Sequence, residues 1–300
     1  MAERREPSAT STEPREGSDG EGVLRIVATP IGNLEDITLR ALRVLAEADL
    51  VLAEDTRRTR VLLERHGVTA RPVSLHAHNE ASRIARTLEV LAAGGSVVLV
   101  SDAGTPLVSD PGERLAAAAV EAGVRVESVP GASAVTAALA GAGLPSTPFA
   151  FLGFPPRKRG AREALFDAYR GRPETLVLFE SPRRLGSTLA ELAARLGPRR
   201  ACVARELTKR HEEWVRGSLD ELARRFSEGA RGEITLVVAG ASEAEEAACE
   251  GASSVDVDRA VRELVAEGHS PKEIAARLAP ETGLRKRDLY ARALAARDEA

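Results

Sequence analysis

The chain has 300 residues, of which 43% are hydrophobic and 29% are charged, and its net charge is −3 at neutral pH. This length predicts two compact domains, and the nearly balanced charge excludes a polycation, so nucleic acid could be bound only through local basic patches. The two cysteines exclude a disulfide framework and indicate a reducing compartment such as the cytoplasm, and no apolar run approaches the ~18 residues of a membrane-spanning helix.

Residues 1–22 are rich in Glu, Ser, Pro and Gly and contain no apolar segment typical of a signal peptide. We expect a disordered tail here, because this composition cannot form a packed core. Short apolar runs then alternate with segments of helical periodicity. Strands are predicted at 24–28, 50–53, 72–75, 97–100 and 125–129, and helices at 39–46, 56–66, 81–93, 111–122 and from 133. This alternation predicts a parallel α/β sheet, which we assign to an N-terminal domain, residues 23–145.

Prolines 145, 148, 155 and 156 interrupt the pattern and mark the start of a second domain, residues 146–240. Strands are predicted at 149–152, 175–179, 201–204, 213–216 and 233–238, and helices at 160–169, 182–196 and 219–227. Neighbouring strands joined by a short turn or one helix indicate a mixed sheet, unlike the sheet of the first domain.

The segment 241–254 is acidic and built of small residues, and we expect it to be a linker. Helices are predicted at 255–267, 272–278 and 284–296, the second of them started by the pair Ser270-Pro271. Three short helices with a glycine-containing turn are typical of a helix-turn-helix unit. We therefore expect residues 255–298 to form a small RNA-binding module.

Polar residues follow every predicted strand of the first domain, at the edge where parallel α/β sheets bind ligands. The five clusters are Pro30 to Asn33, Glu54 to Arg57, His76 to Glu80, the loop beginning at Asp102, and Pro130 to Ser133. Neither a G-x-G-x-x-G nor a G-x-x-x-x-G-K motif follows the first strand, which argues against NAD and ATP. Five clusters at one edge predict a functional cleft, although Asp102, Asn79 and Ser133 taken singly are also typical turn or cap residues.

The stretches TPIGNLEDIT, AEDTR, LHAHNE, VSDAGTPLVSDPG and VPGASAVTAAL, in this order, resemble the tetrapyrrole methylase superfamily. Within it they are similar to the ribosomal RNA small subunit methyltransferase I group. The resemblance implies a two-domain α/β tetrapyrrole-methylase fold, with a parallel-sheet N-terminal domain, a mixed-sheet second domain and a C-terminal helix-turn-helix-like module. It also implies a homodimer that uses S-adenosylmethionine to methylate a cytidine 2'-hydroxyl in 16S rRNA of the small ribosomal subunit.

The same resemblance implies that the cofactor lies between the two domains. The loop at Asp102 would hold its methionine part, with Gly104 allowing close backbone approach and Thr105 adding a hydroxyl, and residues of the second domain would line the adenosine. The implied cofactor-binding residues are Pro30, Asp102, Ala103, Gly104, Thr105, Ser133, Ala134, Phe179, Leu207, Glu233 and Ile234.

A ribose hydroxyl is a poor nucleophile, so we expect a base to take its proton. Glu54 and Asp55 are candidates, because paired acids at a strand end raise one another's pKa, and Glu180 is a third; the sequence does not choose among them. Asn33 is included with the catalytic residues for its place in the first loop, although its amide cannot act as a base. Tetrapyrrole-modifying members usually end this loop in Gly-Asp-Pro, so Asn33 favours the RNA branch.

Basic residues supply the expected RNA contacts, although any one such cluster is nearly as well explained as solvated surface. The candidates are Arg57, His76, His78, Arg157, Lys158, Arg159, Arg285, Lys286 and Arg287. His76 and His78 alternate on an extended segment and could bind a metal together with Glu54 or Asp55. We favour hydrogen-bonded histidines and expect no metal.

Two other functions remain open at this point. One is a methylase acting on a corrin or sirohaem, against which the basic loop, Asn33 and the C-terminal module count. The other is a non-catalytic, ligand-sensing regulator that reads nucleic acid through its helix-turn-helix, although acids at several strand ends exceed what a sensor needs.

Overall fold

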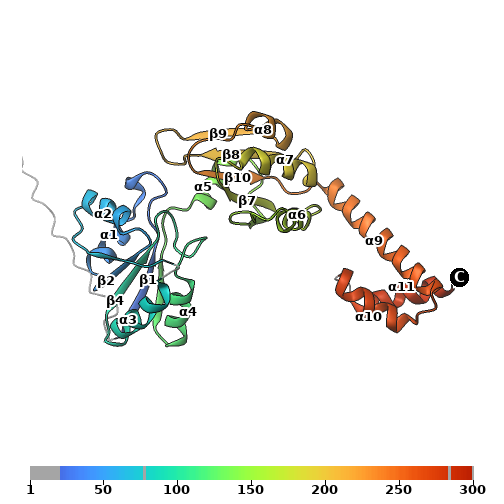
Figure 1. The fold of residues 1–300 in the computed structure, drawn as a ribbon, viewed down its shortest axis with the longest axis horizontal. Coiled ribbons are helices and arrows are strands. Elements are labelled where there is room, and N and C mark those ends of the chain that lie inside the picture. The colour runs from blue at the N-terminus through green and yellow to red at the C-terminus, as the bar shows by residue number, and fades with distance from the viewer. Residues whose placement is uncertain (1–20, 77–78, 283–284, 299–300) are drawn as a thin grey trace, which may run out of the picture. The chain divides into compact units, whose positions relative to one another are not determined.

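The structure of the chain is a computed structural model that describes residues 21–76, 79–282 and 285–298. Nearly all of the predicted tail, and His78, lie outside these residues. Contacts divide the chain into two units, which are described separately (Figure 1). The first runs to Ala137 and includes the distant segment Leu207–Arg210, and the second contains Ala138–Glu206 and everything from His211.

The first unit contains a five-stranded, fully parallel sheet in the order β3-β2-β4-β1-β5, which confirms the predicted parallel α/β architecture. The strands are β1 (Val23–Val27), β2 (Leu50–Ala53), β3 (Pro72–Ser74), β4 (Ser96–Val100) and β5 (Arg125–Val129). The helices are α1 (Leu39–Ala46), α2 (Thr56–Arg65), α3 (Glu80–Ala92) and α4 (Glu113–Glu121), with a short 3-10 turn, η1 (Leu34–Asp36), that was not predicted. Helix α5 (Ala134–Ala142) begins in this unit and continues into the second.

Both faces of this sheet are buried, which explains why its strands are continuous apolar runs. Val98 and Val100 point to the face that packs on α1 and α2, whereas Val97 and Leu99 point to the face that packs on α3 and α4. Because side chains alternate along a strand, one run such as β4 supplies both cores. The sheet thereby carries all five strand ends to one edge.

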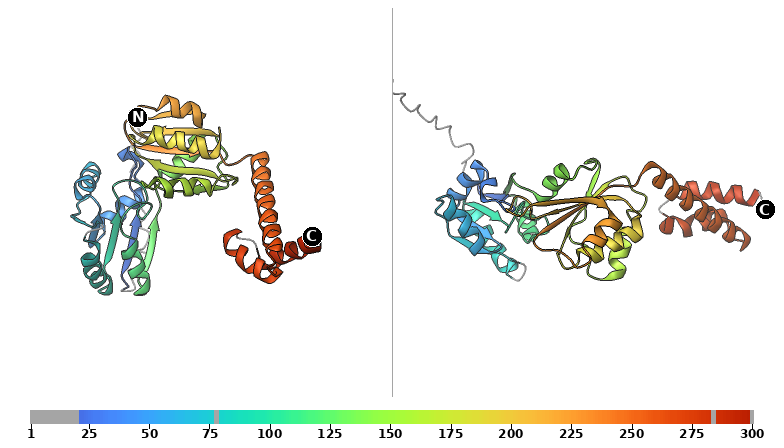
Figure 2. Two further views of the ribbon diagram at one scale, coloured as in Figure 1. Left: turned by 45° about the vertical axis from the view of Figure 1, so that its right-hand side comes forward. Right: turned by 90° about the horizontal axis from the view of Figure 1, so that it is seen from above.

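The second unit is built on a mixed sheet in the order β6-β7-β10-β8-β9, as predicted. Its strands are β6 (Phe149–Phe151), β7 (Thr175–Glu180), β8 (Arg200–Arg205), β9 (Glu213–Ser218) and β10 (Ile234–Val238). Only β6 and β7 are parallel, and the other neighbours are antiparallel. The helices α6 (Arg159–Asp167), α7 (Leu185–Leu196) and α8 (Leu219–Arg225) pack their apolar residues on one face, visible below the sheet in the right-hand view of Figure 2.

The C-terminal part consists of α9 (Glu243–Ala266), α10 (Pro271–Thr282) and α11 (Lys286–Asp298), which share an apolar core around Val261, Ile274 and Leu289. The predicted start of the first of these helices at residue 255 is too late, because α9 already begins at Glu243, so most of the segment expected to be a linker is helical. Ser242 and Glu245 form a reciprocal capping box there, and alanine and glutamate are strong helix formers. In the part of the chain that the structure describes, no helix has the length and apolarity needed to cross a membrane.

Candidate active site

Neighbouring strands of the first sheet are joined to one another just beyond their carboxyl ends. The backbone N–H of Asp55, after β2, donates to Asp102 Oδ1, after β4, at 2.8 Å. Thr29, after β1, and Gly104 exchange two backbone hydrogen bonds of 2.9 and 3.0 Å. Four of the five predicted clusters lie on β1, β2, β4 and β5, which are direct neighbours in the sheet. The strand ends therefore form one connected rim.

The loop after β4 has an unusual backbone. Gly104 has φ +77°, and two residues with side chains, Leu107 and Ser109, also adopt left-handed conformations with φ of 72° and 71°. Each such residue costs about 1 kcal/mol or more, so surrounding contacts must impose this shape. A Cβ at Gly104 would lie 3.4 Å from the Ile31 side chain and 3.8 Å from the carbonyl oxygen of Ala132. The loops after β1, β4 and β5 thus meet at this glycine.

Glu54 is half-buried at the rim, and its pKa is raised. Burial is the main cause, followed by the negative charges of Asp102 and Asp110, while the backbone N–H of Asp102 and the cation of Arg58 act in the opposite direction. Asp110 also has a raised pKa, chiefly through burial and then through Asp102, opposed by a hydrogen bond with Ser101. A carboxylate whose pKa is raised is a better proton acceptor, so these surroundings suit a general base.

Asp110 is a member of the site that sequence reasoning missed. It lies in the quoted motif VSDPG, but a Pro-Gly pair after an aspartate is typical of a turn. The signal that could have found it was its position ten residues after β4, within the same loop as Asp102.

Asp55 has the opposite environment from its neighbour. Its Oδ1 accepts from the backbone N–H of Arg57 at 2.8 Å, which caps α2, and its Oδ2 pairs with the Arg57 guanidinium at 2.8 Å. Hydrogen bonds from Arg57 lower the pKa of Asp55 to about 2. The expectation that the two acids raise one another's pKa is therefore wrong for Asp55, and Arg57 is already paired.

The loop after β1 packs on the segment Leu207–Arg210. The backbone N–H of Asn33 donates to Thr208 Oγ1 at 2.9 Å, and Asn33 Oδ1 accepts from the N–H of Glu35 at 3.1 Å, which caps η1. A Cβ at Gly32 would lie only 2.8 Å from the carbonyl oxygen of Leu207. A groove of about 690 Å³ lies here, lined by Gly32, Asn33, Leu34, Glu35, Arg65, Thr208, Lys209 and Arg210. Pro30, in the same loop, is buried. Leu207 belongs with the first unit rather than with the second domain.

Ser133 and Ala134 are half-buried at the start of α5, where the Ser133 carbonyl accepts from the N–H of Ala137 at 3.0 Å. Asn79 precedes α3, yet its side chain makes no cap hydrogen bond; it accepts from the N–H of His76 at 2.8 Å instead. His76 itself is exposed. No group of three metal-binding side chains occurs among the described residues.

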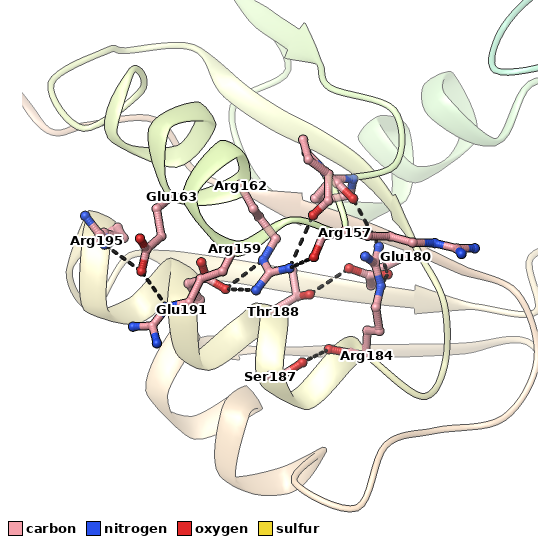
Figure 3. Close-up of polar contacts among 12 residues, drawn as sticks. Arg157, Arg159, Arg162, Glu163, Glu180, Arg184, Ser187, Thr188, Glu191 and Arg195 are labelled. Atoms are coloured by element: carbon pink, nitrogen blue, oxygen red, sulfur yellow. Dashed lines mark hydrogen bonds and ion pairs between the residues drawn. The ribbon is translucent and has the colours of Figure 1, made fainter.

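The structure argues against Glu180 of the second unit as the base. Its side chain has no exposed surface, and it accepts from Arg184 Nε at 2.8 Å, Thr188 Oγ1 at 2.6 Å and the N–H of Ser181 at 2.6 Å (Figure 3). With its oxygens occupied by neighbours in the same unit, this carboxylate supports the fold. Of the other predicted residues in this unit, Phe179 is half-buried, Ile234 is buried in β10 and Glu233 is exposed.

The predicted RNA-binding cations differ in their partners. Arg159 pairs with Glu163 at 2.9 Å, and Arg285 and Arg287 share Asp288 at 2.9 and 3.2 Å. Arg157, Lys158 and Lys286 are exposed, and within the described residues no acid pairs with them. Among the predicted cations that the structure describes, these three remain available to an anionic ligand.

Comparisons with known proteins agree with this geometry. Residues 23–223 match the family model of tetrapyrrole (corrin/porphyrin) methylases, and residues 251–297 match the model of the RsmI C-terminal HTH domain. Among solved structures, uroporphyrin-III-C-methyltransferase from Thermus thermophilus is 27% identical, with a TM-score of 0.54 over 73% of this chain and 94% of that one. The methyltransferase CobJ, 22% identical, has a TM-score of 0.57 over 74% of this chain and 95% of its own. The class is thus a methyltransferase of the tetrapyrrole methylase fold.

The curated relatives narrow this class. A ribosomal RNA small subunit methyltransferase I from Mesorhizobium japonicum is 46% identical and covers 93% of this chain and 93% of its own length. The protein of the same name from Mycobacterium tuberculosis is also 46% identical, over 93% of this chain and 96% of its own. The chain belongs to the ribosomal RNA small subunit methyltransferase I family.

Proposed function

We propose that the chain transfers the methyl group of S-adenosylmethionine to the 2'-hydroxyl of a cytidine in 16S rRNA of the small ribosomal subunit. The observation that carries this proposal is the rim after β2 and β4, where Glu54, its pKa raised, lies against the backbone N–H of Asp102. This arrangement occurs in a chain that shares 46% identity, over 93% of its length, with a protein named for ribosomal RNA methylation.

The residues at the rim fit the methyl donor. Glu54, Asp102 and Asp110 concentrate negative charge there, which suits a ligand that carries a sulfonium and an ammonium group. Gly104 leaves room for close backbone approach at the junction of three loops. We assign the methionine end to Asp102, Ala103, Gly104 and Thr105, with Pro30, Ser133 and Ala134 beside it. Phe179, Leu207, Glu233 and Ile234 stay predictions for the adenosine.

When bound, the donor supplies an electrophilic methyl group and leaves as a neutral thioether. The protein must then position the ribose oxygen and remove its proton. Glu54 is the base that the structure favours over Asp55 and Glu180, because its pKa is raised while Asp55 is held near pKa 2 by Arg57 and Glu180 is fully buried. Asn33 positions the first loop through its cap of η1.

A tetrapyrrole methylase is the second candidate, favoured by the fold of the solved relatives. Asn33 replaces the aspartate that such enzymes usually carry, and the relatives that match over 90% of the chain are named for ribosomal RNA. We also propose that the chain is a cytoplasmic homodimer. Its proposed domains are residues 23–145, 146–240 and 255–298.

The decisive experiment measures transfer of labelled methyl from S-adenosylmethionine to purified small subunits, free 16S rRNA, uroporphyrinogen and duplex DNA. We expect label only in RNA, on the ribose of a single cytidine after nuclease digestion, and labelling about 10²- to 10⁴-fold slower with Glu54→Gln. Label in the tetrapyrrole would replace our proposal with the second candidate. Donor binding without transfer to any substrate would leave a ligand-sensing regulator. Light scattering on the purified chain tests the homodimer.

A further inference from the structure

The loop between β6 and α6, residues 154–158, has the sequence Phe-Pro-Pro-Arg-Lys and belongs to the second unit. Phe154 is 57% exposed, unusual for a large apolar side chain, and Arg157 and Lys158 are exposed beside it. Pro155, by contrast, is buried. The loop thus buries Pro155 and presents one aromatic and two cationic side chains outward.

Two arginine side chains donate hydrogen bonds to backbone carbonyl groups of this loop. Arg162 Nη1 donates to the carbonyl oxygens of Pro156 and Arg157 at 3.2 and 3.3 Å, and Arg184 Nη2 donates to that of Pro155 at 3.2 Å (Figure 3). Three successive carbonyls are therefore fixed by guanidinium groups. Both arginines are thus used within the unit, with side chains only 16% and 28% exposed.

Each of these arginines is anchored in turn by a carboxylate. Arg162 pairs with Glu191 at 2.6 Å, and the two side chains are 16% and 15% exposed. Arg184 pairs with the fully buried Glu180 at 2.7 Å. The side chain of Arg157 extends away from this network in Figure 3 and joins none of its contacts. The network rigidifies the loop while leaving its outward cations unneutralised.

The ring of Phe154 is supported by other aromatic residues. Its centroid lies 5.5 Å from that of Phe179 at an interplanar angle of 57°, and Phe179 lies 4.9 Å from Phe151 in an edge-to-face contact at 68°. Aromatic pairs at this separation favour one another beyond their buried area. The ring is thereby held in place without being covered.

We propose that residues 154–158 form a platform for an unpaired nucleotide of the RNA substrate, with the base stacked on Phe154 and the adjacent phosphates held by Arg157 and Lys158. Aromatic side chains that stack on unpaired bases beside cations are the usual means of binding single-stranded RNA. A protein partner would cover the ring but has no need of two free cations held on a rigid loop. The inference rests on the proposed function, because it takes the substrate to be RNA.

Fluorescence anisotropy with a labelled single-stranded cytidine hexaribonucleotide tests this platform on the full chain. Phe154→Leu should weaken binding about 5- to 150-fold, since one stacked base is worth roughly 1–3 kcal/mol, and Phe154→Tyr should restore it. The double variant Arg157→Ala, Lys158→Ala should reduce the slope of log K against log salt by about 1.4, since each phosphate on a single strand contributes roughly 0.7. Arg170→Ala, an exposed arginine of the same unit, should change neither.

Equal affinities for wild type and Phe154→Leu, in a variant with wild-type melting temperature, would overturn the stacking, and an unchanged salt slope would overturn the phosphate contacts. Methyl transfer to small subunits separates this inference from the proposed function. If wild type methylates RNA but the platform variants bind the probe normally, only the platform is wrong. If wild type methylates no RNA, the proposed function fails first.

Discussion

The backbone N–H of Asp55 donates to Asp102 Oδ1 at 2.8 Å and so connects the end of β2 to the loop after β4. These residues are 47 positions apart in the chain, and they become neighbours because β2 and β4 are adjacent parallel strands. The bond fixes the Asp102 carboxylate beside Glu54, so one contact organises both the loop that we propose for the cofactor and the proposed base.

Asp102→Ala should weaken binding of S-adenosylmethionine about 10- to 100-fold, because hydrogen bonds to a charged group contribute roughly 1.5–3 kcal/mol. Titration calorimetry at neutral pH measures the change. Asp220→Ala, which removes an exposed carboxylate from α8, is the matched control and should bind normally. Equal affinity in the two variants would show that the loop holds no part of the donor.

Glu54→Gln should lower kcat about 10²- to 10⁴-fold, since a positioned general base contributes a factor of this size, while donor affinity stays near wild type. Single-turnover methylation of small subunits gives the chemical rate. Asp55→Asn serves as the comparison, because Asp55 is held at a pKa of about 2 by Arg57 and should lose far less activity. A larger loss in Asp55→Asn than in Glu54→Gln would reverse the assignment.

Asp110→Asn should move the acidic limb of the pH–rate profile to lower pH. The Asp110 charge raises the pKa of Glu54, so its removal lowers that pKa and Glu54 loses its proton at a lower pH. The measurement is kcat as a function of pH for wild type and variant, with Glu113→Gln on α4 as the control. A limb that stays in place would mean that Glu54 is not the group titrating.

Glu180→Gln should reduce stability and leave the chemistry intact. Removing one partner of a buried ion pair costs about 3 kcal/mol, and Arg184 also has a buried Nη1 without a hydrogen-bond partner in the described structure. Urea unfolding measures the loss, with the exposed Glu228→Gln as the control. Should kcat per folded molecule fall as sharply as in Glu54→Gln, Glu180 would return as a candidate base.

Gly32→Ala should destabilise the first unit by about 1–3 kcal/mol. A Cβ at this position would lie 2.8 Å from the carbonyl oxygen of Leu207, a backbone atom that cannot move without shifting the whole segment. Gly160→Ala is the contrasting variant, since its Cβ would meet nothing within 4 Å and alanine is the better helix former. Thermal unfolding measures the stability of both variants. A Gly32→Ala variant as stable as wild type would show that the segment Leu207–Arg210 shifts to accommodate the added Cβ.

Local pattern was sufficient for most of the architecture. Apolar runs such as β4 and the periodicity of α1 identified the elements. A strand that is buried on both faces is a continuous apolar run, and a helix that is buried along one side has apolar residues at helical spacing. The pattern failed at α9, where the small and acidic residues after Ser242 are typical of linkers and of helices alike. The rim was also foreseeable, since parallel strands end at a common edge.

The sequence by itself therefore determined the two sheets, the C-terminal helices and the gathering of polar residues at one edge. Only the tertiary structure decided which acid is suited to act as a general base. The pKa of Glu54 is raised by burial and by the charges of Asp102 and Asp110. Asp55 is paired with Arg57, and Glu180 is enclosed by Arg184 and Thr188. The tertiary structure also separated Arg157, which faces outward, from Arg162, which holds the loop. The reason is physical, because a side chain's charge state and reach depend on burial and on neighbours that are remote along the chain.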